Sequence, residues 1–169
     1  MIKQWQSLTG KIILLLTLCG FMSACGFQLR GAQEVSADKQ QVTIISGNAN
    51  SELLKSLRQN MKFNGVREIA GAPYQIQLRQ FRYKRRAATI SSSADVDEYE
   101  LSVEVVMLVA DQQGNPITSD IKLQRDRTYT YNKNAAAASS EQEELLRREL
   151  YNSVAQSILR RYLSSNSAQ

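Results

Sequence analysis

The sequence predicts an α+β fold, a two-layer sandwich of two helices packed on a four-stranded mixed sheet, in the order β-α-β-β-β-α. Two observations support this fold class. Four segments carry β-branched or alternating apolar residues, and two others repeat apolar residues at helical spacing. Two amphipathic helices can cover one face of such a sheet, so that both apolar stripes are buried in a single core.

The first three predicted elements form a strand-helix-strand unit. Residues 41–46 are rich in β-branched side chains, which favours a strand. Residues 51–64 have a helical apolar face, and Asn50 or Ser51 can cap their start. Residues 74–84 form the second strand, which we expect to follow the helix through a right-handed crossover. The apolar face of the helix consists of Leu53, Leu54, Leu57 and Met61.

The second predicted strand changes its apolar parity. Its apolar side chains fall on even positions up to Leu78 and on odd positions from Phe81. Because side chains alternate between the two faces of a strand, either a bulge lies between these residues or both faces are partly covered.

The last three predicted elements are two strands and a long helix. Residues 99–110 and 121–131 alternate as strands, and residues 140–163 carry the second helical stripe. Ser140 and Glu143 have the spacing of a capping box at the start of this helix. Its buried stripe consists of Leu146, Leu150, Val154, Ile158 and Tyr162.

The N-terminus has the organisation of a lipoprotein signal. Lys3 and Lys11 precede an apolar run over residues 12–22, and this run is too short to span a bilayer. Small residues then precede Cys25, in a pattern that resembles a bacterial lipobox. The alternative is an ordinary signal peptide cut near Ala24, with Cys25 a bystander.

The lipobox interpretation divides the chain into four parts. Residues 1–24 are the signal peptide, which is removed, and residues 25–40 are the lipidated N-terminus and tether. Residues 41–163 form a single domain, and residues 164–169 form a flexible tail. The mature chain would then have 169 − 24 = 145 residues, which suits one hydrophobic core.

The composition of this mature chain excludes several classes of site. Its net charge falls from +5 to +3 with the loss of two lysines, which is too small to indicate nucleic acid. Cys25 becomes its only cysteine, so an intramolecular disulfide is impossible. The sequence has no histidine, so a histidine base and a zinc site of histidines or thiolates are excluded. We expect neither a metal nor a cofactor.

A basic run in and after the second strand is the main candidate binding site. Arginine can hold phosphate by paired hydrogen bonds, which makes Lys84, Arg85 and Arg86 candidates, joined by Lys133 from another loop. A second interpretation stays open, in which a hairpin places these cations opposite carboxylates of the next strand. The carboxylates are Asp95, Asp97, Glu98, Glu100 and Glu104.

The sequence also argues against an enzyme. It has neither a nucleophile-elbow serine nor a glycine-rich phosphate loop. The acidic group at Asp95, Asp97 and Glu98 lacks the glycine and the terminal glutamate of a calcium loop. A hydrolase that uses paired carboxylates is the remaining catalytic alternative, and an anchored binding or assembly module is the favoured interpretation.

The residues after the lipobox resemble the LptE family of lipopolysaccharide-assembly lipoproteins. Members open with cysteine, glycine, an aromatic residue, a variable residue and Leu-Arg, as residues 25–31 do here. Residues 57–66 resemble the family's first helix with its Asn-Gly-Val stop, residues 98–101 its third strand and residues 141–151 its last helix. The resemblance implies two helices on a four-stranded sheet.

The resemblance also implies a role at the outer membrane. LptE proteins plug the lumen of a large outer-membrane β-barrel, LptD, help it to assemble, and bind lipopolysaccharide. Gly26 fits sorting to the outer membrane. At the positions where relatives carry lipopolysaccharide-binding cations, this chain has Ser92 and Ala138. The alternative function is an auxiliary lipoprotein of a periplasmic lipid-transport ABC system.

Overall fold

The computed structural model describes residues 35–47, 49–92 and 94–165. Cys25, Gly26, the predicted signal peptide and the end of the predicted tail lie outside the described residues. The strands are β1 (Gln41–Ser46), β2 (Arg67–Glu68), β3 (Tyr74–Ile90), β4 (Val96–Asp111) and β5 (Ile121–Thr130). The helices are α2 (Ser51–Phe63) and α3 (Ala136–Ser164), with short 3₁₀ turns η1 (Ala37–Lys39) and η2 (Lys133–Ala135).

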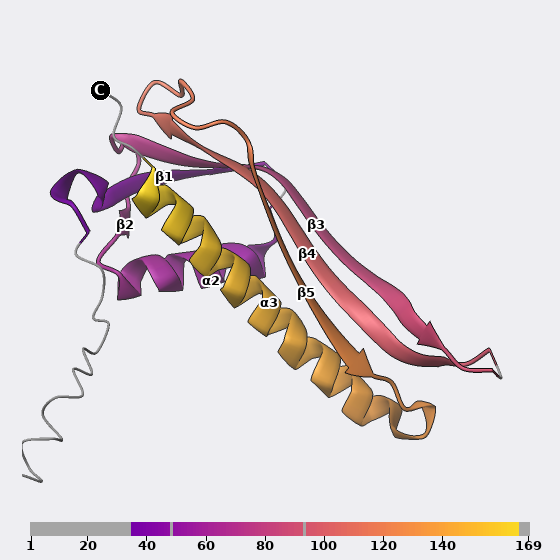
Figure 1. Cartoon of the computed structure of the whole chain (residues 1–169). Helices are drawn as coiled ribbons and strands as arrows, with labels where there is room; N and C mark the ends of the chain where they lie inside the picture. The colour runs from indigo at the N-terminus through magenta and orange to yellow at the C-terminus, as the bar shows by residue number, and fades with distance from the viewer. Residues whose placement is uncertain (1–34, 48, 93, 166–169) are drawn as a thin grey trace, which may run out of the picture. The chain divides into compact units, whose positions relative to one another are not determined.

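The described part is a two-layer α+β structure with a mixed sheet in the order β2-β1-β3-β4-β5. Figure 1 shows both helices on one side of this sheet, with α3 running along the length of the long strands. The predicted class and layers are therefore confirmed. The parallel pairing of β1 with β3 around α2 also agrees with the predicted strand-helix-strand unit.

The prediction of four strands is wrong, because the sheet has a fifth. β2 is only two residues long and pairs in parallel with the start of β1. Backbone hydrogen bonds hold it there, from Arg67 N–H to the Gln40 carbonyl at 2.8 Å and from Ile69 N–H to the Val42 carbonyl at 3.0 Å. A two-residue strand has no alternation to detect, which is why sequence periodicity missed it.

Local signals set the ends of α2 as the sequence predicts. The Glu52 N–H donates to the side-chain oxygen of Asn50 at 2.7 Å, so Asn50 is the N-cap. Gly65 has a φ of +73° after the helix end, a left-handed conformation that glycine adopts without steric penalty. The chain then turns directly into β2.

The long strands extend well beyond the predicted ranges. β3 has 17 residues and β4 has 16, and they pair as far as Ile90 and Val96. The register shifts between Leu78 and Gln80, which confirms the predicted bulge and moves the later odd positions to the helix-facing side. Residues 84–90 are exposed, so they lack the alternating apolar side chains from which this extension of the strand could have been predicted.

Helix α3 starts four residues before the predicted start. It begins at Ala136, and no side-chain hydrogen bond caps its first turn. The predicted capping box of Ser140 and Glu143 is therefore wrong, because both lie inside the helix. Alanine has the highest helix propensity, so Ala136, Ala137 and Ala138 extend the helix without a cap.

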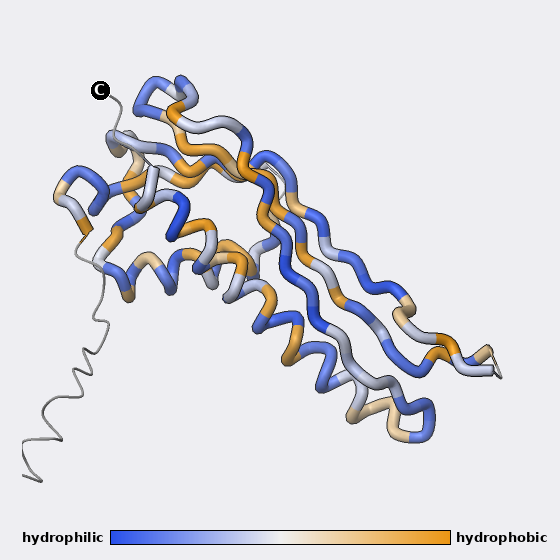
Figure 2. The backbone as a smooth tube through the Cα atoms, viewed as in Figure 1, coloured by the Kyte–Doolittle hydropathy of each residue, from blue (hydrophilic) through white to orange (hydrophobic). Residues whose placement is uncertain are grey.

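The apolar core lies between the sheet and the halves of the helices near β1. Leu57, Met107 and Ile158 are fully or almost fully buried there, from α2, β4 and α3. Figure 2 shows the hydrophobic residues concentrated at this end, whereas β5 is largely hydrophilic. The far half of the sheet must therefore be held to α3 by other contacts.

Polar contacts fasten the residues before β1 to the end of α3. The Lys39 ammonium, which is 5 % exposed, donates to the Leu163 carbonyl at 3.0 Å and to the Ser165 carbonyl. The Tyr162 hydroxyl lies 3.0 Å from the Lys39 carbonyl and 3.1 Å from the Gln41 carbonyl. Residues 37–40 thus pack with the domain, ahead of the predicted domain start at residue 41.

We predict that Tyr162→Phe lowers the free energy of unfolding by about 1 kcal/mol, because two buried carbonyls lose their hydrogen-bond donor. Urea denaturation measures this. Tyr131→Phe is the control, since no hydrogen bond from the Tyr131 hydroxyl is found among the described residues and its ring, which packs against Tyr99 and the core, is kept. Equal stability of the two variants would contradict the role of the Tyr162 hydroxyl.

Candidate functional site

The basic run of β3 is divided between the two faces of the sheet. Strand alternation places Arg82, Lys84 and Arg86 on the face away from the helices, which we call the outer face. Arg85 lies on the helix-facing side, where it contacts Glu143 of α3. The outer-face cations line a shallow hollow of about 210 Å³, together with Glu100, Ser102, Glu104 and Gln124.

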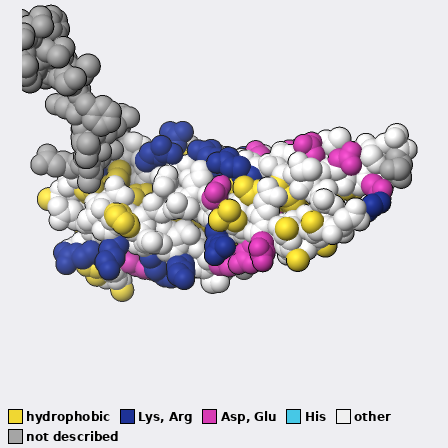
Figure 3. Space-filling view, turned by 90° about the horizontal axis from the view of Figure 1, so that it is seen from below, with side chains coloured by type: hydrophobic (Ala, Val, Ile, Leu, Met, Phe, Trp, Pro, Cys, Tyr) yellow, Lys and Arg dark blue, Asp and Glu magenta, His cyan; other side chains and the backbone are white. Residues whose placement is uncertain are grey.

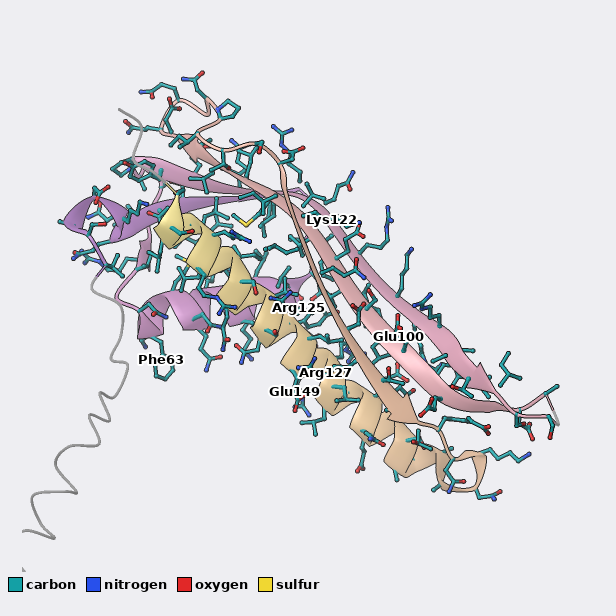
Figure 4. The ribbon with its side chains drawn as sticks, in the orientation of Figure 1. Phe63, Glu100, Lys122, Arg125, Arg127 and Glu149 are labelled. Carbon is teal, nitrogen blue, oxygen red and sulfur yellow. The ribbon has the colours of Figure 1, made fainter. Side chains whose placement is uncertain are left out.

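Most outer-face cations are paired with carboxylates of the next strand. Arg86 binds Glu100 through two hydrogen bonds of 2.8 and 3.0 Å. Glu104 lies 2.7 Å from the Lys122 ammonium and 3.8 Å from the Arg82 guanidinium. The hydrogen bond from Lys122 is the main reason that the pKa of Glu104 is lowered. Figure 4 shows Glu100 and Lys122 on these neighbouring strands.

These pairs agree with the charge-pairing interpretation of the basic run. Arg82 and Arg86 face the carboxylates that the hairpin was expected to bring opposite them. Among the described residues no carboxylate forms an ion pair with Lys84, although it lies in the same hollow. Lys84 is therefore the outer-face cation with the most freedom to meet an external anion.

Glu143 is the centre of a polar cluster on the helix-facing side. Its carboxylate accepts hydrogen bonds from the Tyr129 hydroxyl at 2.5 Å and from the Tyr83 hydroxyl at 3.4 Å. The Arg85 guanidinium lies 3.0 Å from the same carboxylate and donates to the Tyr129 hydroxyl at 3.2 Å. It also stacks 3.6 Å from the centre of the Tyr99 ring. We call these five residues the Glu143 cluster.

The cluster keeps Tyr83 and Tyr129 protonated. Burial, followed by the charge of Glu143, raises the pKa of Tyr83 to about 12. Burial and the hydrogen bond to Glu143 raise the pKa of Tyr129, while Arg85 lowers it. A phenolate at either position would face the Glu143 carboxylate, so both hydroxyls act as donors at neutral pH.

Lys133 lies apart from the other three candidates. Its ammonium contacts the Asp95 carboxylate at 2.7 Å, which joins the segment after β5 to the turn between β3 and β4. That hydrogen bond raises the pKa of Lys133. Ser92 is exposed in the same turn, and Ala138 is exposed in the first turn of α3. The four predicted cations thus form no single patch. Lys84 and Arg86 lie on the outer face, and Arg85 belongs to the Glu143 cluster. Lys133 lies at the hairpin turn.

Sequence reasoning missed the Glu143 cluster. It placed Glu143 in a cap, and it treated Arg85 as one of three equivalent cations. The signal that was available is the odd-numbered pattern of β3 and β5, which places Arg85 and Tyr129 on the same face, the one that the helix covers. Among the described residues there is no group of three or more potential metal ligands, and no helix there is long and apolar enough to cross a membrane.

We predict that Arg85→Gln destabilises the domain by about 1–2 kcal/mol, because it removes the contact with the Tyr99 ring and the hydrogen bonds to Tyr129. Arg86→Gln is the matched control. Its side chain is 71 % exposed, so we expect little change. Urea denaturation of both variants gives the comparison, and equal losses would show that the Glu143 cluster adds nothing.

We also predict that stability falls as the pH rises from about 10 to 12. Since the folded state raises the pKa of Tyr83 and Tyr129, their stabilising effect is complete below the ordinary tyrosine pKa and is lost above it. Phenolate absorbance should show late-titrating groups that Tyr83→Phe reduces. If all tyrosines titrated together near pH 10 in the folded protein, this role of burial would be wrong.

Comparisons with known proteins match this fold. The chain is 24% identical over 153 residues to the LPS-assembly lipoprotein LptE of Pectobacterium atrosepticum, covering 87% of this chain and 81% of the relative. It is 26% identical over 164 residues to the LPS-assembly lipoprotein LptE of Photorhabdus laumondii, covering 94% and 88%.

Two solved structures share the architecture. A minor lipoprotein from Acinetobacter baumannii superposes with a TM-score of 0.64 at 23% identity, covering 78% of this chain and 97% of that one. The rare lipoprotein B from Shewanella oneidensis gives 0.60 at 24% identity, covering 71% and 91%. The family model for LptE, described as lipopolysaccharide-assembly, matches residues 39–162. The chain therefore belongs to the LptE family of lipopolysaccharide-assembly proteins.

Proposed function

We propose that this protein is an outer-membrane lipoprotein that takes part in lipopolysaccharide assembly and insertion at the cell surface. In this proposal it plugs the lumen of the LptD β-barrel and helps that barrel to assemble. The observation that carries the proposal is the match of the LptE family model to residues 39–162, nearly the whole described domain. The role is one of binding and assembly, without catalysis.

The outer face of the sheet supports a position inside a barrel. The interiors of outer-membrane channels are polar. The outer face offers charges that are already paired within the domain, Arg86 with Glu100 and Lys122 with Glu104. A neutralised polar surface loses less solvation free energy in a confined, hydrated space than unpaired charges would. The hairpin of β3 and β4 extends this surface to Ile90 and Val96.

We expect the barrel to be captured through the outer face and the hairpin turn. A photo-crosslinking residue at Ser102 in the outer-face hollow, or at Ser92 in the turn, should give a large adduct in cells. Gln59, exposed on the opposite layer in α2, is the matched control. Mild-detergent purification of tagged protein should recover the same barrel. A monomer without adducts from any position would contradict the plug.

The proposal includes lipidation of Cys25, which lies outside the described residues. Labelling with radioactive palmitate should mark the mature chain and should disappear in Cys25→Ser. Membrane fractionation then distinguishes two locations, the outer membrane and the inner membrane. Recovery in the outer membrane supports the barrel partner, and recovery in the inner membrane would favour the auxiliary lipoprotein of an ABC system instead.

Direct lipopolysaccharide binding is proposed at the outer-face cations and at Lys133. Lys84→Ser combined with Arg86→Ser should weaken binding of purified lipopolysaccharide about tenfold, because two cations near the lipid A phosphates are lost. Arg127→Ser with Arg161→Ser is the control, since it removes the same charge from exposed positions elsewhere. Unchanged affinity in the first variant would leave the outer-face cations as partners of the acidic strand only.

A further inference from the structure

The end of α2 carries the most exposed large apolar side chain among the described residues. Phe63 is the last residue of this helix and is 81 % exposed. Figure 4 shows it pointing away from the ribbon. Ile69, just after β2, is 38 % exposed. We call Lys62, Phe63, Arg67 and Ile69 the entry surface, because they lie beside the place where the chain enters the domain.

Phe63 lies at a turn whose backbone is held in place by hydrogen bonds and buried side chains. The Val66 N–H donates to the Met61 carbonyl at 2.9 Å, and both side chains are buried. Gly65 adopts the positive φ that this turn requires. The helix end is therefore anchored on both sides of Phe63, so the ring is held in solvent by well-packed neighbours.

Two cations of the entry surface line a hollow beside the helix end. This hollow of about 490 Å³ is lined by Arg58, Met61, Lys62, Gly65, Val66, Arg67 and Glu68, whereas Phe63 lines a second hollow with Glu52, Lys55, Arg148 and Glu149. Arg58 is paired with Glu68 at 2.6 Å, while Lys62 and Arg67 form no ion pair within the described part of the chain. In Figure 3 most Lys and Arg side chains gather over the left part of the face and the acidic ones lie further right. The entry surface thus combines exposed apolar groups with uncompensated positive charge.

The length of the chain limits how far this surface can lie from Cys25. Arg67 N–H is hydrogen-bonded to the Gln40 carbonyl, so β2 lies directly beside the first residues of the domain. Val35 is the tenth residue after Cys25, and ten residues span at most about 33–36 Å. A lipid on Cys25 therefore keeps the entry surface within reach of the membrane that holds it.

We propose that the entry surface seats on the membrane, with Lys62 and Arg67 on anionic phospholipid headgroups and the Phe63 ring at the boundary with the acyl chains. Aromatic rings and cations favour this region of a bilayer, the cations where its lipids are anionic. The inference rests on the proposed lipidation of Cys25. It orients the domain with the β1 end at the membrane surface.

The sequence allows a clean spectroscopic test. Trp5 is the only tryptophan and Cys19 the only other cysteine, so the mature chain has no tryptophan and a single thiol at Cys25. Coupling Cys25 to a maleimide phospholipid tethers the mature chain to vesicles without the cell's lipidation. Phe63→Trp then reports on its surroundings, and Ile90→Trp, at a hairpin position 61 % exposed, is the matched control.

In vesicles of phosphatidylethanolamine and phosphatidylglycerol with brominated acyl chains, the tryptophan at position 63 should be quenched at least threefold more than the one at position 90. Lys62→Ser with Arg67→Ser, or replacement of the anionic lipid by phosphatidylcholine, should weaken this quenching. Lys84→Ser with Arg127→Ser should not. Circular dichroism checks that every variant is folded.

Equal quenching at both positions would overturn the proposed seating. Quenching of position 63 that is insensitive to charge would overturn the part assigned to anionic headgroups. Because the tether is chemical, these results do not depend on lipidation in cells. Absence of palmitate labelling from the unsubstituted chain would therefore refute the anchor, whereas an unquenched position 63 would refute the seating alone.

Discussion

The Glu143 carboxylate holds the first half of α3 on the sheet. The helix has 29 residues, about 44 Å, yet Ser139 is its only buried residue before Leu150 among those described. Apolar packing is therefore sparse along the first half of the helix, where Leu146 packs against the core only partly buried. Beyond that point Tyr83, Tyr129 and Arg85 converge on the Glu143 carboxylate from β3 and β5. This arrangement satisfies a half-buried charge with three donors and lets the sheet continue past the apolar core.

The two ends of the domain consequently differ in physical character. Near β1 the core is apolar, and Lys39 and Tyr162 fasten the incoming chain to the end of α3. Toward the hairpin, polar and aromatic contacts join the layers. The last residues of β3 and β4 are held mainly by their backbone pairing with each other. This difference between the two ends agrees with the proposal that the domain contacts a barrel toward the hairpin and a membrane near β1.

The sequence was informative where one residue type has one structural meaning. Asn50 as a cap, Gly65 after the helix and the parity change after Leu78 each follow from local stereochemistry, and the structure confirms them. β2 escaped because two residues carry no period. The capping box failed because the helix begins at Ala136, four residues before the predicted start. The partners of Glu143 come from β3 and β5, and only the pairing of these strands with β4 brings them together. A charged residue in the sequence likewise does not indicate which face of the sheet it lies on. Arg85 could therefore not be distinguished from the basic residues next to it.

The separation of paired from unpaired charge has a functional meaning. On the outer face, carboxylates of β4 neutralise Arg82 and Arg86, so that surface is polar without a strong field. At the entry surface Lys62 and Arg67 lack such partners in the described chain, and Phe63 lies exposed between them in sequence. A hydrated barrel interior favours a surface whose charges are already paired, because such a surface needs few new ion pairs from the barrel. A bilayer with anionic headgroups favours the entry surface, since it supplies the missing counter-charges and accepts the ring. The two proposed environments, a barrel interior and a bilayer surface, thus correspond to the unequal distribution of charge along the domain.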